Sequence, residues 1–307
     1  MDCVGFIRQK RIEMKGTPFK YWIKAARPKT LLVSMAPVIM TVALVSVFVK
    51  INWLPAIICL VFAVMAQIIS NFVNDYSDGV KGIDENRIGP ERMVASGLIS
   101  PQKMRRGIMT MCAVTFVLGC SLMYWGGLIL LPFGIVIMLC ALAYSMGPFP
   151  LSQHALGDMA VVLFYGIAPV VLTFFIQTGC INWQIFIAGL AIGMVINNLL
   201  IVNNYRDADE DLKNGKKTTV NVFGKHFMKA VYFTNPLIAI VLSFVFLDKI
   251  INPIILIFAM MPFLAYSTIV SVKFDKAKDM ELNKLIGMSS LEAIVFALTI
   301  TFVVIFK

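Results

Sequence analysis

The sequence has little charge. Charged residues fill 14% of its 307 positions, whereas hydrophobic residues fill 59%, and the mean hydropathy is +0.83. Soluble globular domains carry about 25% charged residues. The scarcity of charge therefore excludes an ordinary water-soluble domain and places the chain in a lipid bilayer.

Histidine and paired cysteine are also scarce. The chain has two histidines, His154 and His226, and six cysteines that form no Cys-x-x-Cys pair. Imidazole and thiolate are the usual ligands of zinc and iron–sulfur sites, so a site of that kind is not expected. A metal bound here has to be held by oxygen, which points to carboxylates.

The long apolar runs carry almost no charge at their centres. Cation-coupled transporters place charged residues near the bilayer midplane beside broken helices, so transport is a less favoured alternative. The segment Asp-Gly-x-x-Ala-Arg, which opens the magnesium site of the phosphatidyltransferases of phospholipid synthesis, is absent. The net charge of +10 is accounted for by orientation in the membrane, and no nucleic-acid partner is expected.

Apolar runs dominate what is present. A spanning helix takes about 20 mainly apolar residues, and the first run, Leu31 to Val49, is too long for the apolar part of a cleaved signal peptide. We predict an all-α, polytopic bundle forming one transmembrane domain over residues 1–307, with residues 1–27 as a basic cytoplasmic segment at the membrane surface. The nine predicted spanning helices begin near Leu31, Leu54, Arg106, Leu128, Met159, Trp183, Lys229, Pro253 and Gly287.

The basic residues predict how this bundle is oriented, because loops retained in the cytoplasm collect Lys and Arg. With the N-terminus inside, all 27 Lys and Arg except Lys50, Lys249 and Lys307 fall on the cytoplasmic side. We expect a multi-pass protein of the inner membrane whose two longest polar connections face the cytoplasm.

The first of these connections continues the second apolar run and is acidic. Asn71, Asn74, Asp75 and Asp78 stand at i, i+3, i+4 and i+7. In a continuing helix this spacing places the four side chains on one face.

The second connection continues the sixth apolar run and repeats the pattern. Asn204, Asp207 and Asp211 stand at i, i+3 and i+7. The same motif at the same end of two helices suggests two related halves of four helices each, with the ninth helix as an addition.

Clustered carboxylates at a membrane edge repel one another and are costly to desolvate, so they need cations or protons. Magnesium takes one or two carboxylates, with water and substrate phosphate in its remaining positions. Two magnesium ions bridged by a diphosphate, one at each motif, would neutralise the cluster. The alternative is that these side chains only cap and solvate helix ends. That alternative stays open above all for Asp84 and Asp209.

In these residues the sequence resembles the UbiA-type superfamily of intramembrane aromatic prenyltransferases, whose two Asp-rich motifs follow the second and sixth helices. Within that superfamily it looks most like the 1,4-dihydroxy-2-naphthoate polyprenyltransferases of menaquinone synthesis, and the likeness covers nearly the whole chain. The segments that carry it are Ala26–Leu31, Asn74–Gly82, Arg87–Arg92 and Asn203–Lys216.

The resemblance implies a role for each residue of the motifs. Asp75 and Asp78 are implied to hold one magnesium ion, and Asp207 and Asp211 the other, all four being catalytic. The basic side chains are implied to contact diphosphate oxygens. Substrate binding is implied for Asn71, Asn74, Lys81, Arg87, Arg92, Tyr144, Asn204, Arg206 and Lys216.

One segment departs from the family pattern. After Tyr144 the family commonly has a basic residue in a short Gly-Pro segment, and here Phe149 takes that place. His154 is either a partial substitute for that charge or a solvated loop residue. Tyr144, like Tyr76 and Tyr205, either stabilises a transient cation or belongs to the interfacial aromatic belt.

The reaction implied by the resemblance is transfer of a polyprenyl group from polyprenyl diphosphate to an aromatic ring carbon, after ionisation of the allylic C–O bond. With 1,4-dihydroxy-2-naphthoate the product is demethylmenaquinone, and diphosphate and CO2 are released. The residues alone do not distinguish naphthoate from the alternative acceptor 4-hydroxybenzoate, and they set neither prenyl length nor oligomeric state.

Overall fold

The computed structural model describes residues 17–82, 89 and 91–306. Within these residues the regular secondary structure is helical, apart from one isolated bridge between His154 and Lys217. Eight of its helical segments are long and apolar enough to cross a membrane. They are α3 (Pro28–Val45), α4 (Trp53–Lys81), α5 (Pro101–Ser121) with α6 (Met123–Gly126), α8 (Gly157–Val161) with the π-helical η2 (Val162–Ile167) and α9 (Ala168–Thr178), α10 (Trp183–Lys213), α12 (Lys225–Phe246), α13 (Pro253–Lys276) and α14 (Leu282–Ile305).

Five shorter elements complete the described part of the chain. The amphipathic α2 (Phe19–Ala26) precedes the first spanning helix, and α7 (Leu130–Ala143) is apolar but short. The others are α11 (Thr219–Phe223), and the 3₁₀ turns η1 (Leu151–Gln153) and η3 (Asp279–Glu281).

The prediction of an all-α polytopic bundle is confirmed, and the chain is an integral membrane protein. Of the nine predicted helices, the fourth, expected to begin near Leu128, corresponds to α7. It reaches about 21 Å at 1.5 Å per residue, less than the roughly 30 Å of a hydrocarbon core. Several helices begin earlier than their apolar runs. Thus α5 starts at Pro101 because Ser100 caps it, accepting a hydrogen bond from the Lys103 amide.

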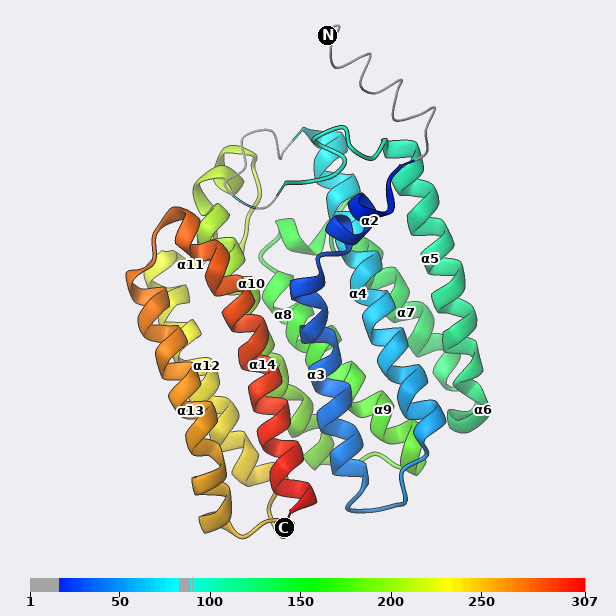
Figure 1. The fold of residues 1–307 in the computed structure, drawn as a ribbon, viewed down its shortest axis with the longest axis vertical. Helices are drawn as coiled ribbons and strands as arrows, with labels where there is room; N and C mark the ends of the chain where they lie inside the picture. The colour runs from blue at the N-terminus through cyan, green and yellow to red at the C-terminus, as the bar shows by residue number, and fades with distance from the viewer. Residues whose placement is uncertain (1–16, 83–88, 90, 307) are drawn as a thin grey trace, which may run out of the picture.

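The longest helix, α10, lies at the centre of the bundle. It packs against α12, α14, η2 and α9, and most of its apolar span is buried. The first spanning helix, α3, packs along the last, α14, so the two ends of the chain's transmembrane part are neighbours (Figure 1). The predicted relation between two four-helix halves stays a prediction.

A carboxyl group lies within the membrane part of the bundle, which the near-absence of charge in the apolar runs does not suggest. Glu292 of α14 is fully buried, and its Oε2 lies 3.5 Å from the Asn198 amide nitrogen of α10. Asn198 in turn accepts a hydrogen bond from Asn235 of α12. These polar side chains join three helices, and neither pocket described in the next subsection includes them.

Glycines bring η2 and α10 into backbone contact. A Cβ atom added to Gly166 would lie 2.5 Å from both the Gly189 carbonyl oxygen and the Gly193 Cα atom. Small residues allow this close approach between membrane helices. The contact fixes η2, which directly follows α8, the short helix that contains Asp158.

Replacing Gly166 with alanine should therefore destabilise the bundle by roughly 1–3 kcal/mol, the usual cost of overpacking a well-packed interior. The free energy change is read from thermal or denaturant unfolding of the purified protein in detergent. Gly134→Ala is the matched control, because a Cβ atom there meets nothing within 4 Å. Equal unfolding midpoints for the two variants would show that η2 and α10 are not in contact.

Candidate active site

The C-terminal ends of α4 and α10 meet at a polar pocket of about 560 Å³, a volume that counts the space at its open side. The two acidic motifs, far apart in the sequence, thus lie at one site. The polar residues lining it are Asn74, Asp78, Arg92, Tyr144, Ser145, Ser152, Asn203, Asn204, Asp207, Glu210, Asp211, Lys216 and Thr218.

Lys216 links the two motifs. Its Nζ atom lies 3.4 Å from Asp78 Oδ2 on α4 and 3.6 Å from Asp211 Oδ1 on α10. Both carboxylates are buried, and a cation placed between them lowers their mutual repulsion. Lys216 is therefore placed where an anionic ligand would meet it.

Arg92 approaches Asp78 from the loop that precedes α5. Its Nη2 atom donates to Asn74 Oδ1 at 3.0 Å and lies 3.7 Å from Asp78 Oδ2. The Arg92 side chain is buried. The pocket thus brings together a carboxylate, an amide oxygen and two cations from two separate loops.

Arg206 lies against the neighbouring Asp207. Its Nε and Nη2 atoms donate to the two carboxylate oxygens, each at 2.6 Å. The same guanidinium donates to Asn203 on α10 and to Asn283 on α14. Arg206 does not line the pocket, so in this structure it orients Asp207, and its predicted contact with diphosphate stays a prediction.

The expectation that the four polar residues of α4 share one face is only partly met. Asn74 and Asp78 form one i, i+4 row and line the pocket, whereas Asn71 and Asp75 form the adjacent row and do not. Asn71 donates to the Ala26 carbonyl oxygen at 2.8 Å. The physical reason is that consecutive helix residues such as Asn74 and Asp75 are rotated by about 100° about the helix axis, so the two rows face different neighbours.

Asp75 lies outside the pocket, and both of its carboxylate oxygens accept backbone hydrogen bonds. Oδ1 accepts from the Val94 amide at 2.8 Å and Oδ2 from the Met93 amide at 3.0 Å. The side chain is 1% exposed. These two hydrogen bonds tie Asp75 to the loop that carries Arg92, and its role as a magnesium ligand stays a prediction.

Two further expected residues, Lys81 and Asp209, lie outside the polar pocket. Lys81 is exposed on the last turn of α4, and Asp84 and Arg87 lie outside the described residues. Asp209 points away from the pocket: its side chain is 86% exposed and pairs with Lys225 at 3.1 Å. For Asp209 the structure favours the solvated alternative.

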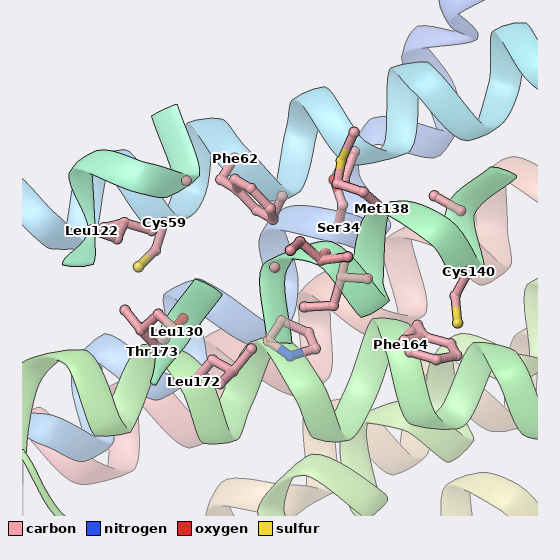
Figure 2. A pocket seen from close by; sticks show the side chains of 18 of the residues that line it. Ser34, Cys59, Phe62, Leu122, Leu130, Met138, Cys140, Phe164, Leu172 and Thr173 are labelled. Carbon is pink, nitrogen blue, oxygen red and sulfur yellow. The ribbon is translucent and has the colours of Figure 1, made fainter. Parts of the chain in front are cut away.

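A second, apolar cavity of about 1280 Å³, again counting open space, lies between α4, α7 and α9 (Figure 2). Figure 2 shows Phe62 of α4 and Leu172 of α9 on opposite sides of it. Tyr144 lines both this cavity and the polar pocket. The polar pocket and the apolar cavity therefore adjoin at Tyr144.

Tyr144 keeps its proton in this position. Burial raises the pKa of the Tyr144 hydroxyl above its usual range, and the negative charge of Asp158 raises the pKa further. The neutral hydroxyl remains a hydrogen-bond donor at the junction. The two other tyrosines named from the sequence lie elsewhere: Tyr205 packs on Phe274, and neither it nor Tyr76 lines either pocket.

The loop segment after Tyr144, which differs from the family pattern, carries Phe149 and His154. Phe149 is exposed and stacks on His154, with ring centroids 3.7 Å apart. Neither ring lines the polar pocket. Phe149 is therefore not part of the wall of the polar pocket.

Several lining residues carry no signal in the sequence. Ser145, Ser152 and Thr218 are ordinary loop residues by sequence, and Glu210 falls between the spaced aspartates. Only their proximity to Tyr144, Asp207 and Lys216 in the chain could have suggested them.

The oxygen atoms facing the pocket suit a hard cation. Asn74, Asp78, Asp207 and Asp211 supply amide and carboxylate oxygens from two helices. Among the described residues no three His, Cys, Asp or Glu side chains converge as a ready-made cage. Magnesium normally binds through one or two carboxylates together with water and substrate phosphate, so this donor set fits it.

Comparison with known proteins places these features in a family. The UbiA prenyltransferase family matches residues 34–291. The 1,4-dihydroxy-2-naphthoate octaprenyltransferase of Haemophilus influenzae is 33% identical over 67% of this chain and 70% of its own length. The enzyme of the same name from Mycobacterium tuberculosis is 31% identical over 74% of this chain and 78% of its own length.

A solved structure shares the fold. The UbiA homolog from Archaeoglobus fulgidus bound to GPP and Mg2+ aligns with a TM-score of 0.66 at 15% identity, covering 92% of this chain and 100% of that one. The resemblance stated from the motifs is thereby confirmed over most of the sequence. With its two acidic helix ends gathered at one pocket, the chain belongs to the UbiA prenyltransferase family.

Proposed function

We propose that this membrane protein transfers a polyprenyl group from polyprenyl diphosphate to 1,4-dihydroxy-2-naphthoate, giving demethylmenaquinol, the reduced form of demethylmenaquinone, with release of diphosphate and CO2. The observation that carries the proposal is the junction at Tyr144 between a charged pocket and an apolar cavity. A prenyl diphosphate has the same division into a charged head and an apolar chain. The acceptor is proposed from the two naphthoate prenyltransferases to which the chain is similar.

The head of the substrate is proposed to bind at the acidic motifs. Asp78 of α4, and Asp207 and Asp211 of α10, would hold two magnesium ions, with Asn74 and Asn204 orienting their water or phosphate ligands. When bound, magnesium supplies Lewis-acid chemistry that neutralises the diphosphate and makes it a better leaving group. The structural neighbour with GPP and Mg2+ supports this choice of ion.

Arg92 and Lys216 are the side chains that would stabilise the leaving diphosphate. Both already lie next to Asp78 at the pocket, at 3.7 Å and 3.4 Å. Charge-assisted hydrogen bonds to phosphate oxygens strengthen as negative charge develops on the departing group. No further movement of α4 or α10 is needed to present them.

The allylic carbon would lie at Tyr144, with the chain extending into the apolar cavity. The face of a tyrosine ring can stabilise a nearby cation, and the neutral hydroxyl does not compete as a nucleophilic phenolate. The cavity wall keeps water from the allylic cation, so an electron-rich ring carbon of the acceptor captures it. Loss of the naphthoate carboxylate as CO2 then restores the aromatic ring.

The location of this site is also a proposal. The distribution of Lys and Arg favours a cytoplasmic N-terminus in the inner membrane, with the polar pocket on the cytoplasmic side. Both substrates would then be reached from that face and from the bilayer, in a single transmembrane domain.

An acceptor comparison tests the proposed function. We expect purified protein in lipid, with labelled polyprenyl diphosphate and magnesium, to prenylate 1,4-dihydroxy-2-naphthoate and to lose this activity when EDTA removes the metal. Product only with 4-hydroxybenzoate would keep the reaction class and replace the acceptor. Absence of product with every aromatic acceptor would contradict the proposal. Phe149→Arg serves as a control, and little change in acceptor preference is expected because Phe149 lies outside the pocket.

A further inference from the structure

The two cations at the polar pocket are carried by loops rather than by the helices that carry the carboxylates. Arg92 precedes α5, and Lys216 lies between α10 and α11. Lys and Arg side chains lose substantial conformational entropy when they are fixed. Something in the fold has to hold each loop in place, and in both cases an aspartate outside the pocket contacts it.

Asp75 holds the first loop. Its two carboxylate oxygens accept the amide hydrogens of Met93 and Val94, the two residues that follow Arg92. The loop also lies close against α4, because a Cβ atom added to Gly79 would be 2.8 Å from the Val94 side chain. Both backbone amides are thereby hydrogen-bonded. This fixes the backbone conformation from which the Arg92 side chain reaches Asn74.

Asp158, at the start of α8, holds the second loop. It accepts a hydrogen bond from the Thr219 hydroxyl, and its Oδ1 accepts from Asn197 Nδ2 at 3.0 Å. Thr219 lies three residues after Lys216. Asp158 lines neither pocket, and the motif analysis does not single it out.

Backbone hydrogen bonds fix the rest of the loop that carries Lys216. The Lys217 amide donates to the Gln153 carbonyl oxygen at 3.1 Å, and the Ala155 amide donates to the Lys217 carbonyl oxygen. These bonds join the segment before α8 to the segment that carries Lys216. Asp158 therefore anchors both segments at the point where they come together.

We propose that Asp75 and Asp158 are positioning residues for diphosphate binding, Asp75 acting through Arg92 and Asp158 acting through Lys216. The inference rests on the proposed function for its effect on turnover. It assigns Asp75 a role other than metal ligand, and it gives Asp158 a role in the reaction although it touches no substrate.

Double-mutant cycles test this assignment. Asp75→Ala and Asp158→Ala are each combined with Arg92→Met and with Lys216→Met, and KM for geranyl diphosphate and kcat are measured with saturating magnesium. Loss of an anchor is expected to raise KM roughly tenfold, the scale of one charge-assisted hydrogen bond. Residues that act through one another give non-additive effects, whereas independent ones add.

The expected result is specific to each pair. Asp75→Ala should add little to Arg92→Met, and Asp158→Ala should add little to Lys216→Met. The crossed combinations, Asp75→Ala with Lys216→Met and Asp158→Ala with Arg92→Met, should be close to additive. Additivity in all four combinations would overturn the proposal, as would an equal loss in all four.

Conservative variants separate positioning from general stability. Asp158→Asn should restore most of the affinity, because Asn197 Oδ1, which has no hydrogen-bond partner among the described residues, can accept from the new amide. Asp75→Asn should restore only part, since its NH2 group faces one backbone N–H. Thr219→Val removes only the bond between Thr219 and Asp158, and this variant is used in the cycles if Asp158→Ala fails to fold. An Asp158→Asn protein as weak as Asp158→Ala would count against the proposal.

Binding of inorganic pyrophosphate with magnesium, measured by calorimetry on the same variants, gives a readout that needs no turnover. If wild-type protein makes no prenylated product but the cycles hold in binding, the proposed function fails and the positioning roles stand. If wild-type protein is active and the cycles are additive in both readouts, the positioning roles fail alone.

Discussion

Replacing Asp78 or Asp211 with alanine is expected to lower kcat for prenyl transfer about a thousandfold. Each carboxylate lines the polar pocket, and Lys216 lies between them. Loss of a metal ligand removes Lewis-acid stabilisation worth several kcal/mol, and about 4 kcal/mol corresponds to a factor of roughly a thousand in rate. The loss should appear in the rate at which diphosphate departs and not in the binding of the prenyl chain.

The measurement is single-turnover prenyl transfer across a magnesium titration. Asp209→Ala is the matched control, since Asp209 lies in the same acidic segment but its side chain is 86% exposed and pairs with Lys225. We expect this control to stay within a few-fold of wild type, because exposed ion pairs contribute little. Comparable losses in Asp209→Ala and Asp211→Ala would mean that the pocket has been assigned to the wrong side chains.

Filling the apolar cavity should change which prenyl chains are accepted. Gly134 of α7 lines this cavity, and a Cβ atom there meets nothing within 4 Å. Gly134 lies about 15 Å along the helix from Tyr144, at 1.5 Å per residue. A phenylalanine at this position would occupy space that a long chain needs and a geranyl group does not.

We expect Gly134→Phe to lower kcat/KM for octaprenyl diphosphate about a hundredfold relative to geranyl diphosphate. Displacing the equivalent of three or four methylene groups costs about 3 kcal/mol at 0.8 kcal/mol each, which is roughly a hundredfold. Competition between the two diphosphates in one reaction gives this ratio directly. Gly134→Ala should leave the ratio near that of wild type, and an unchanged ratio in Gly134→Phe would show that the chain binds elsewhere.

The sequence predicts the acidic ends of α4 and α10 because polar residues at helical spacing stand out in an apolar chain. It does not predict that Asn74 and Asp78 face the pocket while Asn71 and Asp75 face other neighbours. That choice depends on which loop packs against which row. Contacts such as Lys216 with Asp78, 138 residues apart, leave no local pattern.

The same limit applies to the helices. Hydropathy locates the apolar runs, yet the short α7 and the early start of α5 depend on flanking glycine, proline and a serine cap. Glu292 shows the converse: one carboxyl within α14 barely alters the hydropathy of its run, although three helices meet at it. Asp158 was missed because a lone aspartate before an apolar run reads as an ordinary helix cap.

The wall of the apolar cavity has one further consequence. Two apolar residues that line it, Phe116 and Ile135, are exposed, and its volume includes open space, so the cavity is not closed off from the surroundings of the bundle. Its contents can therefore exchange sideways with the surrounding lipid. For a substrate of this kind the governing quantity is its mole fraction in the plane of the membrane rather than its molarity in water, so saturation is set by the composition of the bilayer.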